Sequence, residues 1–66
     1  MEITVNGGLR EVADGSTVAE LLADLGLANQ FVAVEVNRQV IARARHPECR
    51  LKAGDKVEIV TLVGGG

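Results

Sequence analysis

The sequence predicts an α+β fold in which one helix packs across one face of a mixed sheet of four or five strands. Three observations indicate this fold: strand-like alternation near the start of the chain, a single amphipathic helix with an N-terminal cap, and a last strand that is apolar on both faces. A helix with one apolar stripe can cover only one face of a sheet. The predicted order is therefore a hairpin, the helix, a third strand, a short strand and a central last strand.

The predicted hairpin begins almost at the start of the chain. Residues 2–5 alternate polar and apolar side chains, as in a half-buried strand. Asn6-Gly7 is a pair that type I′ turns favour, because both central residues of such a turn need positive φ. The return strand runs through Leu9 to Val12, which lie on opposite faces of any strict alternation, and a β-bulge at Gly8 is one way to accommodate them.

The helix is the element that the sequence defines most completely. Thr17 and Glu20 follow a turn at Asp14-Gly15 and have the S/T-x-x-E spacing of a capping box, which satisfies two backbone donors at a helix start. Gly26 suits the left-handed position after a helix, and Leu27 can make the hydrophobic contact of a Schellman motif. The apolar stripe of the helix, at positions i, i+3, i+4 and i+7, consists of Val18, Leu21, Leu22 and Leu25.

A third strand and an irregular segment follow the helix. Residues 31–36 place valines on one face, and Asn37-Arg38 turns the chain toward a short apolar piece at residues 40–41. Residues 43–50 contain the only proline and have no clear period, so we expect an irregular segment with one helical turn at most. A last turn is predicted at Gly54-Asp55.

The last strand, predicted over residues 56–63, is apolar on both faces. Val57 and Ile59 lie on one face, whereas Val60 and Leu62 lie on the other. This pattern suits a strand in the middle of a sheet, with one face under the helix and the other near the surface.

The length and composition allow one small aliphatic domain. We expect the domain to span residues 1–63 and a flexible glycine tail to occupy residues 64–66 of the 66-residue chain. Hydrophobic residues make up 47% of the chain and Phe31 is the only aromatic residue, so the core must consist of Val, Leu and Ile. A single cysteine, Cys49, allows no internal disulfide, which agrees with a reducing compartment.

The charge and hydropathy patterns argue against nucleic acid and membrane as partners. The formal net charge is −2 and the arginines are scattered through both halves of the chain, so no basic stripe is available for phosphates. The apolar stretches are far shorter than the roughly 20 residues of a membrane span. The first residues lack the basic and apolar regions of a signal peptide, and we therefore expect a cytoplasmic protein.

The sequence ends in three glycines, and the carboxylate of Gly66 is the main candidate functional group. A chain-end carboxyl is ionised at neutral pH and is a potential acyl donor. Glycines have no Cβ, so such a tail can lie extended in a narrow channel of a partner, where a larger side chain would clash. An idle, frayed end is the alternative.

The chain resembles a known family over nearly its whole length. The residues that carry the resemblance are 3–7 (ITVNG), 14–22 (DGSTVAELL), 34–37 (VEVN), Leu51, 54–59 (GDKVEI) and Gly65-Gly66. In this order they resemble the ubiquitin-like β-grasp superfamily and, within it, the sulfur carrier (ThiS) family of thiamine biosynthesis. Two residues depart from the family pattern: Gly64 adds a third glycine, and Leu9 lies where a polar residue is expected.

The resemblance implies a carrier that other enzymes act on, with no catalytic residue of its own. An E1-like adenylyltransferase (ThiF type) would adenylate the carboxylate of Gly66 with ATP, and a sulfur donor such as a cysteine desulfurase would supply the sulfur that replaces AMP. A thiazole synthase (ThiG type) would then take sulfur from the resulting thiocarboxylate. Gly64 and Gly65 would thread into these partners. The chain would bind no cofactor, and it lacks the G-x-x-x-x-G-K-[ST] loop that cradles phosphates.

A docking patch for these partners is predicted on the last strand. The patch consists of Val60 and Leu62, on the face turned away from the helix, with Lys56 and Glu58 beside them. We expect Val34 or Phe31 to lie nearby. Such a patch next to a working tail is where a partner would dock. The alternative is that these are scattered surface apolar residues, which are normal in globular proteins.

Two other groups of residues receive a structural interpretation. His46 and Cys49 are three residues apart, which could place a base beside a thiol, but no third group is evident to orient the imidazole. Two such residues cannot provide the four ligands of a structural zinc site. The arginines of the middle segment are Arg38, Arg43, Arg45 and Arg50. They suit a solvated loop or, as the alternative, a surface for an acidic partner.

The glycine tail leaves other functions open. The same chemistry could donate sulfur for molybdopterin, cysteine or a tRNA base, and residues 64–66 cannot separate these acceptors. A ubiquitin-like modifier would instead form an isopeptide bond through Gly66. A binding subunit with an idle tail is a further possibility.

Overall fold

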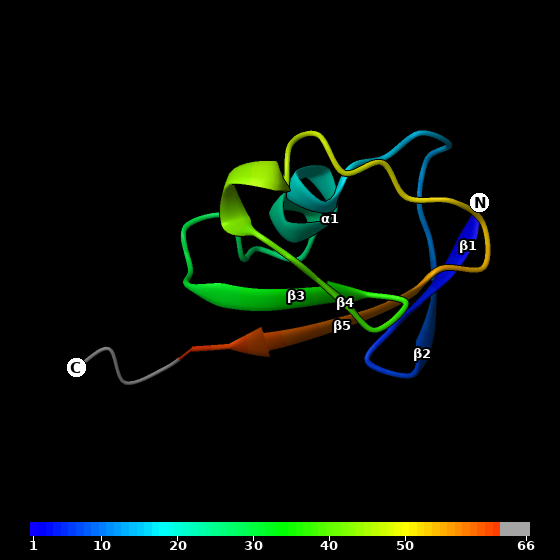
Figure 1. Ribbon diagram of the computed structural model, residues 1–66. Coiled ribbons are helices and arrows are strands. Elements are labelled where there is room, and N and C mark those ends of the chain that lie inside the picture. Colours follow the sequence, from blue (N-terminus) through cyan, green and yellow to red (C-terminus); the bar gives the residue numbers. More distant parts are fainter. Residues whose placement is uncertain (63–66) are drawn as a thin grey trace.

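The computed structural model describes residues 1–62 (Figure 1). Its elements in chain order are β1 (Glu2–Val5), β2 (Gly8–Glu11), helix α1 (Val18–Asp24), β3 (Val32–Val36), β4 (Gln39–Ile41), the 3₁₀ turn η1 (Arg43–Arg45) and β5 (Lys56–Thr61). The predicted domain end at residue 63 and the predicted tail at residues 64–66 lie outside the described residues. Of the described helices, none is long and apolar enough to cross a membrane.

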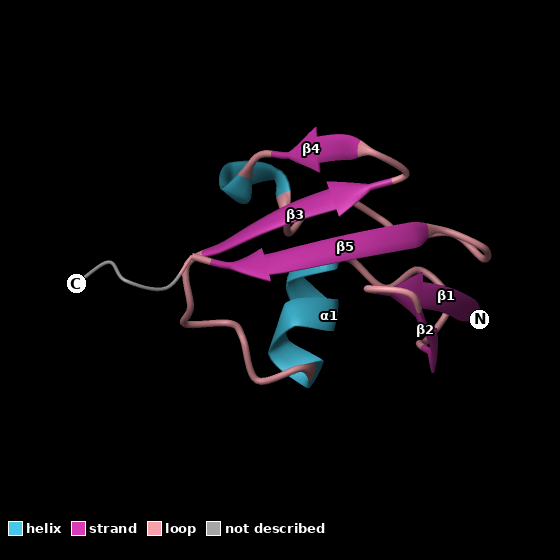
Figure 2. Cartoon of the chain, turned by 90° about the horizontal axis from the view of Figure 1, so that it is seen from below, coloured by secondary structure: helices cyan, strands magenta, loops and turns pink. Residues whose placement is uncertain are grey.

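The five strands form one mixed sheet in the order β2-β1-β5-β3-β4. β1 pairs with β5 in parallel, and the other neighbouring strands are antiparallel. The last strand therefore lies in the centre, as its two apolar faces predicted. Helix α1 packs against one face of the sheet (Figure 2), and we call this the inner face and the opposite one the outer face.

The hairpin of β1 and β2 has the predicted turn but not the proposed bulge. Asn6 and Gly7 have φ values of 50° and 85°, as a type I′ turn requires. The register runs without interruption from Val5 opposite Gly8 to Glu2 opposite Glu11, so the proposed bulge at Gly8 is wrong. Alternation holds throughout because Leu9 points outward, with 73% of its surface exposed.

Both predicted ends of α1 are confirmed. The side chain of Thr17 accepts from the backbone N–H of Glu20 at 3.1 Å, and the Glu20 carboxylate accepts from the backbone N–H of Thr17 at 2.9 Å. At the other end, Gly26 has φ 75° and donates to the carbonyl of Ala23. The N–H of Leu27 donates to the carbonyl of Leu22 at 2.8 Å, which completes a Schellman motif.

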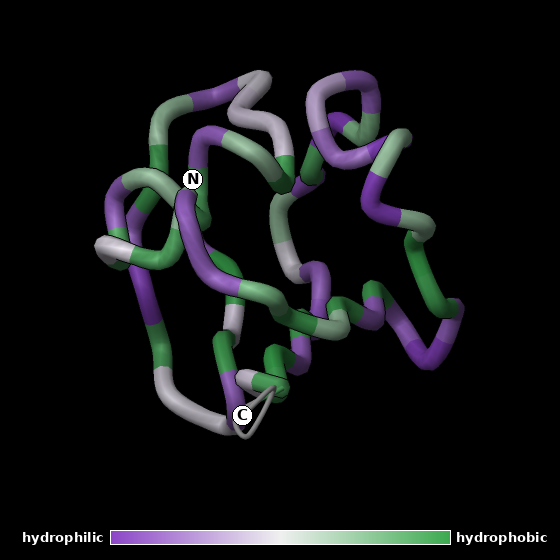
Figure 3. The backbone as a smooth tube through the Cα atoms, turned by 90° about the vertical axis from the view of Figure 1, so that its left-hand side faces the viewer, coloured by the Kyte–Doolittle hydropathy of each residue, from purple (hydrophilic) through white to green (hydrophobic). Residues whose placement is uncertain are grey.

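The core lies between α1 and the inner face. It contains only aliphatic residues, as the composition predicted: Ile3, Val12, Val18, Leu21, Leu22, Val34, Val36, Leu51, Val57 and Ile59. Hydrophobic and hydrophilic segments alternate along the tube in Figure 3, so many short apolar pieces assemble this core. The segment after β4 contributes little to it, and it contains the single helical turn that the sequence allowed.

Candidate functional site

The side chains of β5 divide between the two faces of the sheet. Val57 and Ile59 lie on the inner face with 1% and 8% of their surface exposed. Val60 and Leu62 lie on the outer face with 60% and 56% exposed. Lys56 and Glu58 are also exposed. They share this face because they lie four and two positions before Val60, and alternate residues of a strand point to the same side. The structure thus brings all four residues of the predicted patch onto one free face, and their role in docking stays a prediction.

Phe31 lies beside the end of this patch, whereas Val34 does not. The N–H of Leu62 donates to the carbonyl of Phe31 at 2.8 Å, and the Phe31 side chain is 67% exposed. The guanidinium carbon of Arg43 lies 4.8 Å from the centroid of the Phe31 ring, a cation–π contact that links η1 to this strand end. Val34 is fully buried on the inner face opposite Ile59, so of the two residues offered as neighbours of the patch only Phe31 lies beside it.

The strand register adds residues to the outer face that sequence reasoning missed. Ala33 lies opposite Val60, Glu35 lies opposite Glu58, and Thr4 lies opposite Lys56. Val40 lies opposite Glu35 on the next strand and is 74% exposed. The outer face is therefore apolar toward the end of β5, whereas toward its beginning charged side chains lie beside the exposed Val40 and Leu9. Only the pairing of strands, which single-strand alternation does not specify, reveals this arrangement.

An asparagine side chain fixes β5 on its β1 side. Asn6 donates through its backbone N–H to the carbonyl of Val57 at 2.8 Å. Its side-chain amide donates to the carbonyl of Ile59 at 3.1 Å and accepts from the N–H of Ile59 at 2.8 Å. The amide of Asn6 thus pairs with Ile59 as a peptide group of a neighbouring strand would. Nothing in the local sequence indicates this contact, which joins residues 53 positions apart.

A second asparagine fixes the start of β5. The side-chain oxygen of Asn37 accepts from the N–H of Lys56 at 2.9 Å, and its side-chain nitrogen donates to the carboxylate of Asp55 at 3.0 Å. Asp55 is 9% exposed and also accepts from the N–H of Lys52 at 2.8 Å. These bonds join the turn between β3 and β4 to the turn before β5. The strand that leads to the glycine tail is therefore held from both sides.

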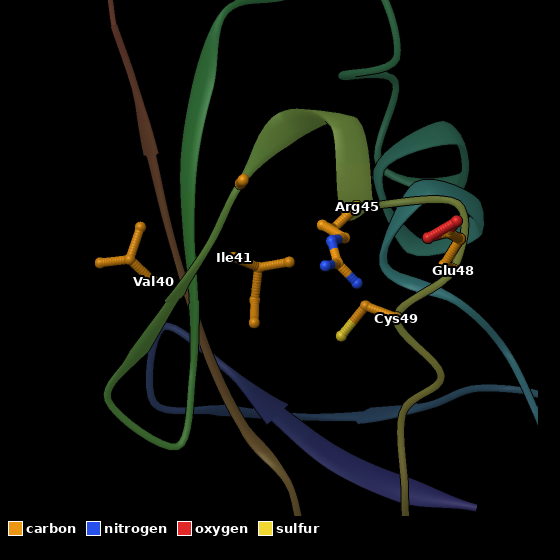
Figure 4. Close-up of a pocket in the computed structure, with 6 residues that line it drawn as sticks. Val40, Ile41, Arg45, Glu48 and Cys49 are labelled. Atoms are coloured by element: carbon orange, nitrogen blue, oxygen red, sulfur yellow. The ribbon is translucent and has the colours of Figure 1, made fainter.

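His46 and Cys49 have separate environments. His46 is 5% exposed, and its Nε2 lies 3.1 Å from the carbonyl oxygen of Ile41. Cys49 lies in a hollow of about 420 Å³ beside β4 (Figure 4), and His46 is not among the residues that line it. The hollow is lined by Val40, Ile41, Ala42, Arg45, Glu48 and Cys49. The backbone contact of His46 supports the structural interpretation of this residue.

The candidate acyl donor, Gly66, and the threading residues Gly64 and Gly65 lie outside the described residues. The structure places the strand that precedes them: β5 ends at Thr61 in the centre of the sheet, beyond the end of β1 (Figure 2). The apolar part of the outer face lies at the same end of β5.

Comparisons with known proteins identify the family. The chain matches the ThiS family over residues 3–66. The sulfur carrier protein ThiS of Bacillus subtilis is 43% identical over 53 residues, which cover 80% of each chain. A thiazole synthase of Paramagnetospirillum magneticum is 36% identical over 66 residues, which are all of this chain but 20% of that enzyme. The chain thus spans about one fifth of the length of this relative.

A solved structure gives the same answer for the fold. The crystal structure of the thiamine biosynthesis protein (ThiS) of Geobacter metallireducens matches with a TM-score of 0.84 and 39% identity, and the match covers 100% of both chains. The one-helix, five-stranded mixed sheet is therefore the predicted β-grasp fold. The family match, the relatives and the solved structure agree, and the chain belongs to the ThiS family.

Proposed function

We propose that the protein is a sulfur carrier for thiazole formation in thiamine biosynthesis and that the carboxylate of Gly66 carries the sulfur. The observation that carries this proposal is the family match over residues 3–66, which extends through the final glycines. A relative that aligns over 80% of its length has the name sulfur carrier protein. In support, the described part of the chain is a β-grasp domain with exposed apolar residues beside the last strand.

The reaction needs an activated acyl group. A carboxylate is a poor acyl donor, and an attack of the Gly66 carboxylate on the α-phosphate of ATP would form an acyl adenylate and release pyrophosphate. The outer sulfur of a persulfide on a donor such as a cysteine desulfurase would then attack the acyl carbon and displace AMP, which forms an acyl disulfide. A thiol would reduce the S–S bond of this acyl disulfide, which leaves the thiocarboxylate on the carrier and a disulfide between the thiol and the donor. This scheme requires that Gly66 ends the chain in the working protein.

The carrier leaves this chemistry to its partners. An E1-like adenylyltransferase of the ThiF type uses the ATP, and the carrier binds no cofactor and supplies no catalytic residue. A thiazole synthase of the ThiG type takes the sulfur. The similarity of this whole chain to one fifth of a thiazole synthase supports the second partner, because that polypeptide includes a segment similar to this chain. All three reactions take place in the cytoplasm.

The docking surface in this proposal is the outer face around β5. Val60 and Leu62 supply apolar contact area, and Lys56 and Glu58 supply charges that orient the partner. These residues lie beside the strand that leads to Gly66. Gly64 and Gly65 extend the reach of the carboxylate into a partner channel that admits only a chain without side chains.

The mass of the intact protein after reaction tests the proposal. The protein is incubated with ATP, a sulfur donor and the adenylating enzyme, and its mass is compared with that of a sample without ATP. Replacement of one oxygen by sulfur supports a carrier. Adducts on lysines of other proteins would show a protein modifier. An unchanged mass without such adducts would contradict both the carrier function and the modifier function. Addition of the thiazole synthase with its other substrates then tests whether thiazole is the acceptor product.

A further inference from the structure

The two edges of β5 have different hydrogen-bonding partners. On the β3 side, the pairing extends along the whole strand from Val36 opposite Val57 to Val32 opposite Thr61. It continues past the strand end, where the N–H of Leu62 donates to the carbonyl of Phe31. On the β1 side, the pairing of strands stops at Val57, because the chain turns back after β1.

The backbone groups of Thr61 face the open edge. Successive residues of a strand direct their N–H and C=O groups to alternate sides. Val57 and Ile59 direct theirs toward the β1 side, where Asn6 bonds both residues. Thr61 follows at the same spacing and therefore directs both groups to the same side. Within residues 1–62, neither group has a partner there.

We propose that the open edge of β5 at Thr61 accepts an extended strand of the adenylating enzyme. Unpaired N–H and C=O groups at a sheet edge are a template for pairing with another chain. The added strand would occupy the place in the sheet that β1 leaves free beyond Asn6. This inference rests on the proposed function, since it names the contact through which the enzyme positions the tail.

The position of Thr61 in the sequence favours this occupant. Gly66 lies five positions after Thr61, and an extended chain over five positions reaches about 17 Å at roughly 3.3 Å per residue. An enzyme that binds the carboxylate of Gly66 thus has its surface within that distance of the open edge. Backbone pairing at Thr61 would set the direction in which the tail enters the enzyme.

The neighbouring side chains define the chemistry of the added strand. Val60 and Leu62 flank Thr61 and project from the outer face, where they are 60% and 56% exposed. Side chains of an added strand on that face would lie beside them at cross-strand distance. The enzyme segment is therefore an extended one with apolar residues at alternate positions toward this face.

A pair of substitutions at one position tests the backbone contact. Thr61→Pro removes the N–H and places a ring at the open edge, whereas Thr61→Val keeps the N–H and the β-branched shape. In ATP–pyrophosphate exchange with the adenylating enzyme, Thr61→Pro should raise the KM for the carrier about three- to tenfold, the effect of one backbone hydrogen bond. Thr61→Val should leave KM unchanged, and kcat should stay the same in both variants.

Three controls make the result decisive. Thermal unfolding should show a similar Tm for Thr61→Pro and the wild type, because this N–H has no partner among residues 1–62. If the proline variant does not fold, amide hydrogen exchange of the wild-type protein is measured instead, with and without the enzyme. The Thr61 amide should exchange at least about tenfold more slowly in the enzyme complex, whereas the exchange rate of the bonded Leu62 amide should change less. Equal KM values for folded variants, or equal exchange in both states, overturn the inference. A wild-type protein that supports no exchange at all would contradict the proposed function itself.

Discussion

Val57 and Val60 are identical side chains three positions apart on one strand, and they lie in opposite environments. Val57 is 1% exposed on the inner face, against α1 and the rest of the core, whereas Val60 is 60% exposed on the outer face. Burial of a valine stabilises a folded domain by about 1.5–3 kcal/mol. Val57 contributes this free energy to folding. Val60 contributes little of it in the isolated domain, so its apolar surface is available to a partner.

The comparison extends to the whole sheet. The inner face contains nearly all of the core residues on the strands, whereas the outer face has apolar residues beside the end of β5 and a mixture of charged and apolar residues elsewhere. A domain of this size has few residues to spare for its core. We therefore interpret the exposed apolar residues beside the last strand as the docking patch of the proposed function. The following changes test this interpretation through their separate effects on the inner face, the outer face and the tail.

The largest expected effect is on the tail. Because residues 64–66 are all glycine, removal of any one of them leaves a chain that still ends in two glycines. The acid is therefore tested by converting the carboxylate of Gly66 into a carboxamide through chemical ligation. This change should abolish formation of the acyl adenylate and leave Tm unchanged. The control is the free acid prepared by the same ligation, and an amidated protein that still reacts would contradict the role of Gly66.

The next effect compares the two valines directly. Val57→Asp places a charge in the core and should lower the free energy of unfolding by more than about 3 kcal/mol. Val60→Asp should change it by less than about 0.5 kcal/mol. The same Val60→Asp variant should raise the KM for the carrier in adenylation at least about tenfold. Denaturant unfolding and pyrophosphate exchange measure the two quantities. Equal losses of stability would mean that Val60 belongs to the core.

A smaller effect is expected where side-chain amides hold β5. Asn6→Gly keeps a residue suited to the φ of 50° and removes the two bonds to Ile59, so the free energy of unfolding should fall by about 1–3 kcal/mol. Asn37→Gly is the matched variant on the other side, at a φ of 51°. Unfolding in urea measures both. An Asn6→Gly protein as stable as the wild type would show that water replaces the amide without loss.

The smallest effect is expected at Cys49. This residue lies beside β4, which β3 separates from β5 in the sheet, and the hollow beside it is lined by residues 40–42, 45, 48 and 49 and by no residue of β5. Cys49→Ser should leave the yield of thiocarboxylate unchanged. Intact mass after reaction measures the yield. A protein that loses sulfur transfer on this change would place the carried sulfur on the thiol instead.

The sequence predicted those features that depend on neighbouring residues. The capping box at Thr17, the Schellman motif at Gly26 and the turn at Asn6-Gly7 all follow from local backbone chemistry, and the structure confirms each of them. The two faces of the last strand follow from its period of two residues. The order of elements in a short chain was enough to indicate the family.

Other features depend on contacts between distant segments, and these were missed or misplaced. Either Val34 or Phe31 was expected near the docking patch, and only the pairing of Val34 with Ile59 shows that Val34 lies on the inner face. The bulge at Gly8 was unnecessary because Leu9 tolerates exposure on the outer face. The amide of Asn6 bonds a residue 53 positions away, and no local pattern encodes that contact. Strand pairing had to be known before these residues could be placed.

The most direct test of the account is to locate the sulfur in the loaded protein. After reaction with ATP, the sulfur donor and the adenylating enzyme, the protein is fragmented in a mass spectrometer, and the fragments that contain Gly66 are compared with those that contain Cys49. The account predicts that sulfur replaces one oxygen on the C-terminal fragment and that a thiol reductant does not remove it. Sulfur added to the fragment with Cys49, and lost on reduction, would contradict the account.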